Sequence, residues 1–178
     1  MATAFLYILG GILILVIFLT IIAPKSYIVS RSIQVKKPLP EVFEYLKYLK
    51  NQQEWSPWSK KDPYMENKIL GVDGKVGAIS YWKGNKEVGE GEQEIVAINE
   101  NESVLTELRF FKPFKSTSKG FIKVEKVLPD VTTIVWGFSG DYKFPMNILM
   151  IFMNMDKTVG KDFEQGLQDL KRNLESDF

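Results

Sequence analysis

The chain has 178 residues, of which 45% are hydrophobic and 13% aromatic, and its formal net charge is +1. A nearly neutral chain lacks the strongly basic footprint of a nucleic-acid-binding protein. Cysteine and histidine are both absent, which excludes disulfides and thiolate chemistry and removes the commonest general base and metal ligand. We therefore expect no metal, no cofactor and no nucleic-acid partner, while the oligomeric state stays open.

The first 24 residues are set apart from the rest by their apolar composition. No charged side chain occurs from Met1 to Pro24, and Ala4–Ala23 is almost continuously Leu, Ile, Val and Phe. A helix of this length crosses roughly 30 Å of hydrocarbon. The sequence predicts a transmembrane anchor over residues 1–24, in contact with the membrane through residues 4–23, and a separate domain over residues 25–178.

A cleaved secretory signal is the alternative for this segment. Such a signal has a basic start, an apolar run of about 7–15 residues and a small-x-small cleavage site. Here the run is longer, and Ala23 is followed directly by Pro24. Four cations lie between Lys25 and Lys37, before the first acid, Glu41. The positive-inside rule therefore predicts a single-pass protein with its domain on the cytoplasmic side.

The domain is predicted to begin with a strand and a short helix. Residues 27–36 alternate in the period of a strand, but Arg31 interrupts the apolar row. That cation is either a rim residue whose head reaches water or a charge that faces a ligand. Residues 38–51 follow as a helix, with proline at its start and Glu41 in its first turn.

Two of the four tryptophans occur in the next ten residues, 54–63. Pro57 and Pro63 predict an irregular connecting loop here. Trp55 and Trp58 either plug the end of the core or line the entrance to a ligand pocket, since both environments favour aromatic side chains.

Six further strands are predicted between residues 64 and 138, because apolar runs alternate there with turn signals such as Asp73-Gly74 and Gly84-Asn85. The predicted strands are Tyr64–Leu70, Val76–Trp82, Glu87–Ile98, Val104–Phe111, Thr117–Val127 and Val131–Phe138.

The third of these strands, Glu87–Ile98, carries acidic side chains on one face and mostly small side chains on the other. Glu90, Glu92 and Glu94 share one face, which is either a metal or acid/base cluster or, as we favour, a solvated surface. Small residues on the other face leave room beside Gln93. On the last strand, Trp136 and Phe138 share a face that we assign to the interior, where they line a pocket or fill the core.

The end of the chain predicts a long amphipathic helix over Phe144–Leu174. Its apolar stripe recurs at steps of three and four residues and consists of Ile148, Phe152, Met155, Val159, Phe163, Leu167, Leu170 and Leu174. The first part, Phe144–Met155, is rich in methionine and is expected to form a mobile lid over a cavity. The second part, Val159–Leu174, is expected to hold helix and sheet together. On this view Phe152→Asp abolishes ligand uptake, whereas Leu167→Asp unfolds the protein.

This order of elements, together with a series of short motifs, resembles the polyketide cyclase/dehydrase-like branch of the SRPBCC superfamily. Members of that superfamily are relatives of START lipid-transfer domains and birch-pollen allergens, and the resemblance covers residues 26–175. The motifs that carry it are Arg31-Ser32-Ile33, Pro40-Glu41-Val42-Phe43, Trp55-Ser56-Pro57-Trp58, Asp62-Pro63, Trp82-Lys83-Gly84-Asn85, Val88-Gly89-Glu90-Gly91, Trp136-Gly137-Phe138-Ser139-Gly140 and Gly160 to Leu167.

The resemblance implies an α+β helix-grip fold, in which a curved seven-stranded antiparallel sheet wraps around a long C-terminal helix. It also implies a deep cavity for a hydrophobic small molecule or lipid, and it gives no catalytic motif that maps onto this chain. The residues expected to line the cavity are Trp55, Trp58, Trp82, Gln93, Leu108, Phe110, Trp136, Phe138, Phe152, Met155 and Phe163.

Three functions are compatible with these features. The first is a membrane-anchored module that binds a hydrophobic ligand or lipid. The second is an enzyme of the cyclase, dehydratase or hydrolase type, with Glu107, Asp141 or Tyr81 as candidate acid/base groups. The third is a stress or accessory protein that recognises a partner. We favour the first, because the chain offers no clear catalytic constellation.

Overall fold

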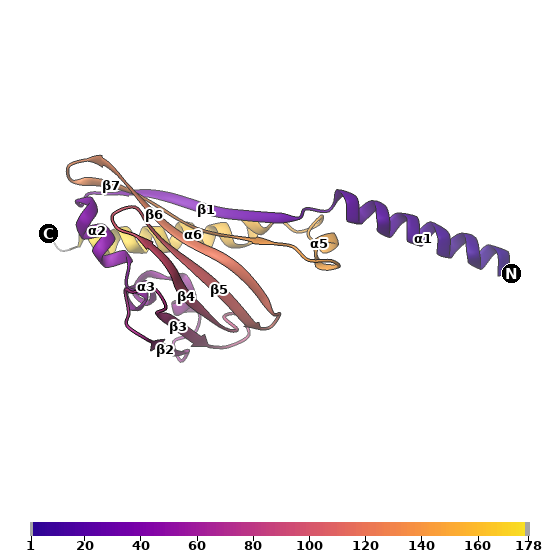
Figure 1. Ribbon diagram of the computed structural model, residues 1–178, viewed down its shortest axis with the longest axis horizontal. Helices are drawn as coiled ribbons and strands as arrows, with labels where there is room; N and C mark the ends of the chain where they lie inside the picture. Colours follow the sequence, from indigo (N-terminus) through magenta and orange to yellow (C-terminus); the bar gives the residue numbers. More distant parts are fainter. Residues whose placement is uncertain (1, 177–178) are drawn as a thin grey trace.

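Seven antiparallel strands form one continuous sheet in the computed structural model, which describes residues 2–176 (Figure 1). The strand order is β1-β7-β6-β5-β4-β3-β2, so the first strand pairs with the last one. The strands are β1 (Ser26–Val35), β2 (Glu66–Leu70), β3 (Ile79–Lys83), β4 (Glu90–Asn99), β5 (Ser103–Lys112), β6 (Ser116–Leu128) and β7 (Val131–Asp141). The predicted α+β helix-grip fold with a seven-stranded sheet is confirmed.

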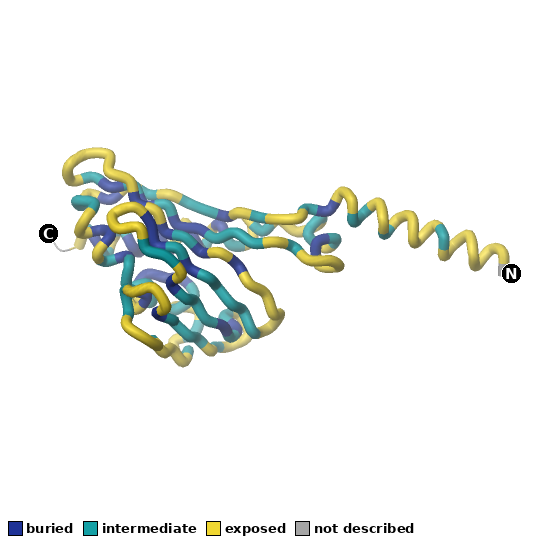
Figure 2. The backbone as a smooth tube through the Cα atoms, in the orientation of Figure 1, coloured by how far each residue is buried: buried dark blue, intermediate teal, exposed yellow. Residues whose placement is uncertain are grey.

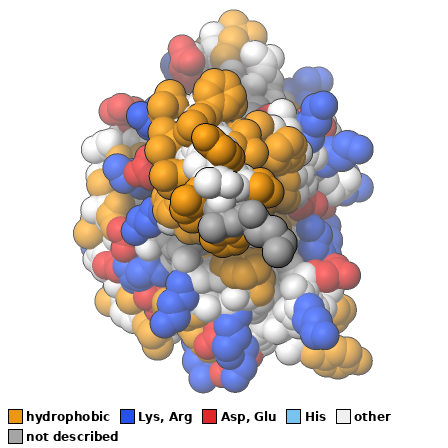
Figure 3. Space-filling model, turned by 90° about the vertical axis from the view of Figure 1, so that its right-hand side faces the viewer, with side chains coloured by type: hydrophobic (Ala, Val, Ile, Leu, Met, Phe, Trp, Pro, Cys, Tyr) orange, Lys and Arg blue, Asp and Glu red, His pale blue; other side chains and the backbone are white. Residues whose placement is uncertain are grey.

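The apolar N-terminal segment is the helix α1 (Ala2–Ile22), which projects from one end of the domain (Figure 1). Its window Thr3–Ile22 is long and apolar enough to cross a membrane, and none of it is buried. Figure 2 shows α1 exposed along most of its length. Seen from the α1 end, hydrophobic side chains occupy the centre of the molecule and charged ones surround them (Figure 3).

Four short helices connect or follow the strands, namely α2 (Leu39–Leu46), α3 (Leu49–Trp55), α4 (Pro57–Lys61) and α5 (Met146–Leu149). The single helix predicted after β1 is thus divided in two. The irregular loop predicted for residues 54–63 is wrong, because α4 occupies part of it. Pro57 lies in the first turn of α4, where the missing N–H of proline costs no helical hydrogen bond.

The long C-terminal helix is α6 (Met155–Glu175), which lies along β1. It begins eleven residues later than the predicted helix, at Met155 rather than Phe144. Asn154 is in an extended conformation and its side chain accepts a hydrogen bond from the backbone N–H of Lys157 at 3.1 Å. That cap satisfies a free N–H group of the first turn and fixes the start of the helix. Ile148 and Phe152 consequently lie outside α6.

An aromatic cluster around Trp136 joins the sheet to the helices. The ring centroid of Trp136 lies 4.6 Å from that of Trp55, 5.6 Å from Trp58 and 4.4 Å from Phe163, all in edge-on geometry. These residues come from β7, α3, α4 and α6. Edge-to-face pairs at such distances add to the stabilisation that burial of the rings provides, so this cluster is the point where four elements are held together.

Two glycines on the sheet-facing side of α6 allow this close approach. A Cβ atom at Gly166 would lie 2.6 Å from the ring of Trp136 and 2.9 Å from the ring of Pro57. A Cβ atom at Gly160 would instead meet the guanidinium of Arg31. The first glycine faces packed rings, whereas the second faces the end of a flexible side chain.

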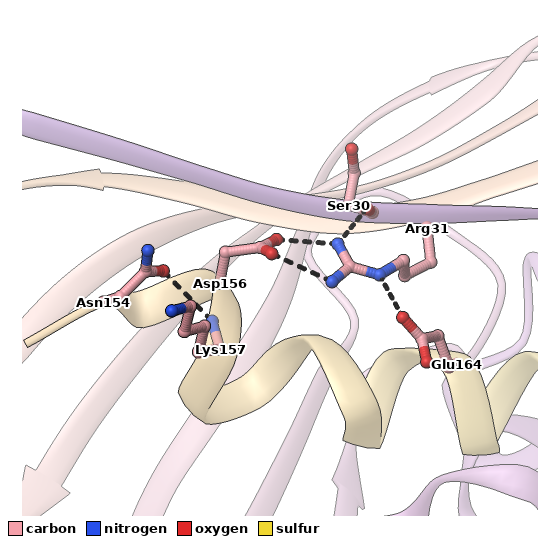
Figure 4. Close-up of polar contacts among 6 residues, drawn as sticks. All are labelled: Ser30, Arg31, Asn154, Asp156, Lys157 and Glu164. Atoms are coloured by element: carbon pink, nitrogen blue, oxygen red, sulfur yellow. Dashed lines mark hydrogen bonds and ion pairs between the residues drawn. The ribbon is translucent and has the colours of Figure 1, made fainter.

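Arg31 joins the first strand to the start of α6 (Figure 4). Its Nη1 and Nη2 donate to the two carboxylate oxygens of Asp156, at 2.7 and 3.0 Å, and its Nε donates to Glu164 at 2.6 Å. The hydrogen bonds from Arg31 hold the pKa of the Asp156 carboxyl below its ordinary value. Of the two readings of this cation, the structure supports the rim residue, because its guanidinium binds carboxylates of α6.

A buried carboxylate connects α4 to the middle of α6. Asp169 is 3% exposed and accepts hydrogen bonds from the side chains of Lys60 and Arg172, and from Nε2 of Gln165 at 2.9 Å. Burial raises the pKa of the Asp169 carboxyl, but the hydrogen bonds from Lys60, Arg172 and Gln165 outweigh it and leave that pKa lowered. The ionised form of Asp169 therefore stabilises the fold.

We predict opposite outcomes for alanine at the two glycines of α6. Gly166→Ala should lower the free energy of unfolding by roughly 1–3 kcal/mol, because the rings of Trp136 and Pro57 have no room to move. This loss exceeds the gain of about 1 kcal/mol in helix propensity. Gly160→Ala should be neutral within about 1 kcal/mol, because the Arg31 side chain can withdraw while the helix gains propensity. Urea titration of the full chain in detergent, followed by tryptophan fluorescence, measures both; equal losses would contradict this packing.

We also predict that Asp169→Asn lowers the free energy of unfolding by about 1–2 kcal/mol at neutral pH, since a charged acceptor of three hydrogen bonds is lost. The lowered pKa means that this contribution is full above the unfolded pKa of about 3.9 and is lost as the pH falls through the folded-state pKa. The difference between Asp169→Asn and the unmodified chain should therefore shrink below about pH 4. Asp162→Asn, which breaks the more exposed pair with Lys61, is the control and should cost less.

Candidate functional site

A cavity of about 440 Å³ lies between the inner face of the sheet and the first half of α6. Inward-facing residues of β3 to β7 form one wall, since alternate side chains of a strand point to the same face. Met155, Val159 and Phe163 of α6 form the opposite wall, whereas Leu167 and Leu170 lie in packed core. The cavity therefore ends where α6 closes onto the sheet at Trp136.

Nine of the eleven residues expected to bind a ligand border this cavity. They are Trp58, Trp82, Gln93, Leu108, Phe110, Trp136, Phe138, Met155 and Phe163. The strand positions follow from alternation, because Leu108 and Phe110 on β5 and Gln93 on β4 fall on the concave face. Their role in ligand binding stays a prediction.

The other two residues, Trp55 and Phe152, lie away from the cavity wall. Trp55 is 1% exposed and packs behind Trp136, in the core. Phe152 is 80% exposed and precedes α6. From the predicted lid, Phe144–Met155, only Met155 borders the cavity. Because Phe152 projects outward, we now expect Phe152→Asp to leave the cavity intact.

The polar groups of the cavity are mainly hydroxyls and amides. The Tyr27 hydroxyl shares a hydrogen bond with Ser118 Oγ at 2.8 Å, and Gln93 Nε2 donates to Thr106 Oγ1 at 3.2 Å. Burial raises the pKa of the Tyr27 phenol, although its hydrogen bond with Ser118 acts in the opposite direction. Tyr27 therefore keeps its proton and can donate it in a hydrogen bond. Its place in the inward row of the first strand was visible in the sequence, but its partner on β6 was not.

The mouth of the cavity lies between the β3–β4 loop and the β5–β6 turn. Glu87 in the loop and Lys112 at the end of β5 are exposed lining residues, and Phe114 of the turn lines the cavity while 70% of its surface is exposed. Lys112 also donates to Glu90 at 2.7 Å. Within residues 2–176, Glu87 and Lys112 are the charged residues that border the cavity. Its interior therefore suits an uncharged group.

The three glutamates of β4 lie on the opposite, outer face of the sheet. Arg109 of β5 donates from Nε to Glu92 at 2.5 Å, from Nη2 to Glu94 at 2.6 Å and from Nη1 to Glu107 at 2.6 Å. The predicted solvated face agrees with this arrangement. Arg109 could not be recognised from the sequence as the shared partner, because its position opposite Glu92 depends on the β4–β5 register.

The candidate acid/base groups also lie outside the cavity. Glu107 belongs to the Arg109 cluster, Tyr81 donates to Glu90 at 3.0 Å, and Asp141 is exposed at the end of β7. None of the three borders the cavity. Among the described residues, no group of three Asp, Glu, His or Cys side chains is placed to hold a metal ion.

The fold has solved counterparts, although the chain matches no protein-family model and no curated protein sequence. Truncated norcoclaurine synthase from Thalictrum flavum superposes with a TM-score of 0.67 at 9% identity, over 88% of this chain and 98% of that one. A protein from Nitrosospira multiformis gives 0.61 at 18% identity, over 84% and 97%. Ara h 8.0201 gives 0.56 at 14% identity, over 85% and 99%. These similarities show that the chain has the helix-grip fold of the birch-pollen-allergen type.

Proposed function

We propose that this protein is a membrane-anchored module that binds a small, uncharged hydrophobic molecule or lipid in the cavity under α6. The observation that carries the proposal is the cavity itself. Its volume of about 440 Å³ falls within the range of roughly 300–1,000 Å³ typical of small-molecule sites. Aromatic and aliphatic side chains dominate its walls, and a few hydroxyl and amide groups interrupt them.

The polar groups define what kind of ligand would fit. Tyr27 and Ser118 lie on one side of the cavity, and Gln93 and Thr106 lie on the sheet floor. A ligand with one or two hydroxyl or carbonyl groups would satisfy these donors and acceptors. A ligand with a buried charge would have no opposite charge to pair with in the interior, which is costly. The proposed ligand is therefore neutral over most of its surface.

The anchor is proposed from α1 and the charges that follow it. Its length and exposed apolar surface suit a bilayer, and the cations of residues 25–37 favour a cytoplasmic domain by the positive-inside rule. A cavity held beside a membrane meets a high effective concentration of apolar molecules. This tethering favours a lipid or another membrane-soluble compound as the ligand.

Binding is favoured over catalysis because the candidate acid/base groups lie outside the cavity. Glu107 and Tyr81 are engaged on the outer face, and Asp141 is exposed at the end of β7. One structural neighbour is norcoclaurine synthase, an enzyme solved with dopamine and hydroxybenzaldehyde. That pair of molecules supports the proposal only in showing that this fold accommodates small aromatic compounds.

We predict that filling the cavity removes the ligand. Leu108→Trp places an indole ring where a smaller side chain lines the cavity. A ligand would then be overpacked against the indole at a cost of about 1–3 kcal/mol, which should lower ligand occupancy roughly tenfold or more. Native mass spectrometry of the full chain, released from detergent after purification from its host, measures the fraction that carries an apolar adduct.

The matched control is Leu105→Trp, the same substitution on the same strand at a residue that does not line the cavity. It should keep the adduct. Two results would count against the proposal: an unmodified chain that stays empty after incubation with a lipid extract of the host, or equal occupancy in both variants.

A further inference from the structure

The segment between β7 and α6 exposes apolar side chains that the fold itself does not use. Residues 144–155 contain no charged side chain, and we call residues 144–153 the α5 segment. Within it, five large apolar side chains are exposed: Phe144 (63%), Met146 (39%), Leu149 (54%), Phe152 (80%) and Met153 (55%). Exposed apolar residues that occur singly need no explanation, but a cluster of this kind indicates an interaction surface.

The α5 segment lies at the end of the domain from which α1 projects (Figure 1). The end of α1 contacts α5, and Ala23, directly after α1, is 4% exposed. The backbone N–H of Tyr142 donates to the carbonyl oxygen of Lys25 at 2.8 Å. The chain that leaves α1 and the chain that enters the α5 segment are therefore fixed side by side.

The backbone of the α5 segment is compatible with a partly apolar environment. N–H groups of Asn147, Ile148, Ile151 and Phe152 donate to carbonyl oxygens three or four residues earlier, at 3.1 to 3.2 Å. Such local turns satisfy polar groups that would otherwise be costly to remove from water. These turns lower the cost of bringing the side chains of the segment into an apolar layer.

The charges around the segment complement an anionic membrane surface. Lys25, whose carbonyl oxygen accepts from Tyr142, and Lys143, the residue after Tyr142, are both exposed. Cations near a bilayer are attracted to acidic headgroups. Asp156, which follows the segment, is occupied by Arg31. Asp141 is the remaining acid at this end of β7.

From these observations we infer that the α5 segment binds the interfacial layer of the bilayer as a second membrane contact beside α1. The inference rests on the proposed anchor, because a helix that spans the bilayer brings its own end, and with it the α5 segment, to the headgroup level. Phe152, Leu149 and Phe144 insert among the upper acyl chains, in the manner of an interfacial amphipathic element. The bound segment holds the domain in one orientation relative to the membrane.

The absence of cysteine allows a direct test with single labels on the full chain. Phe152→Cys, Leu13→Cys and Leu128→Cys are each labelled with nitrobenzoxadiazole and reconstituted into vesicles of phosphatidylcholine and phosphatidylglycerol. Leu13 reports on α1, and Leu128 is an exposed leucine at the β6–β7 turn, far from α1. Lipids with a nitroxide close to the headgroup or deep in the acyl chain act as quenchers.

We expect the label at Phe152 to shift its emission to the blue and to lose most of its fluorescence with the shallow quencher. The label at Leu128 should keep its fluorescence, and the label at Leu13 should be quenched by the deep nitroxide. Adding Leu149→Glu and Met153→Glu to Phe152→Cys should abolish the shallow quenching, because charges now oppose insertion, while α1 stays in place.

The outcomes separate this inference from the anchor on which it rests. Quenching at Leu13 with Phe152 as bright as Leu128 would overturn the interfacial contact and leave the anchor intact. A label at Leu13 that escapes both quenchers would overturn the anchor and the interfacial contact together. Shallow quenching at Phe152 that persists with both glutamates would overturn the assignment, because the fluorophore alone would then account for it.

Discussion

The close packing of α6 against Trp136 is the constraint on which the rest of the structure depends. Gly166 brings the helix against the indole, and Trp55, Trp58 and Phe163 surround that ring. C-terminal to this point, Leu167 and Leu170 are fully buried between helix and sheet. N-terminal to it, Met155, Val159 and Phe163 of α6 line the cavity. One contact therefore divides the interior into a packed half and an open half, and the packed half supplies the stability that an open cavity costs.

Charge is distributed so that the open half stays neutral. The carboxylates of β4 bind Arg109 on the outer face, Arg31 binds Asp156 and Glu164 on the exposed side of α6, and the buried Asp169 is matched by its own partners. Each of these ionised groups thus has its partner away from the cavity interior, and no desolvated charge among them competes with an apolar ligand. The hydrogen-bonding groups that remain inside are hydroxyls and amides, which orient a ligand without demanding a charge from it.

Much of the fold was predictable from the sequence, because period-two runs between turn signals locate all seven strands and the stripe from Val159 to Leu174 locates the helix. The site was less predictable, since it depends on contacts between distant segments. Trp55 and Trp58 are three residues apart, yet one lies in the core and the other on the cavity wall because α3 ends between them. Phe152 continues the apolar period of α6, but the cap at Asn154 excludes it from the helix. Periodicity reports which side chains are apolar, whereas capping and register decide what they touch.

The connection between α1 and the sheet gives the cavity a defined relation to the membrane that α1 is proposed to span. Residues 23–25 alone separate α1 from β1, and β1 pairs with β7 from its first residue, Ser26 opposite Asp141. A connection this short cannot act as a flexible linker, which would need many more residues to let the domain move freely. The β5–β6 turn, which carries the cavity mouth, lies at the end of the sheet that faces the α1 side (Figure 1). The short connection and the β1–β7 pairing therefore fix the direction in which α1 leaves the sheet relative to the cavity.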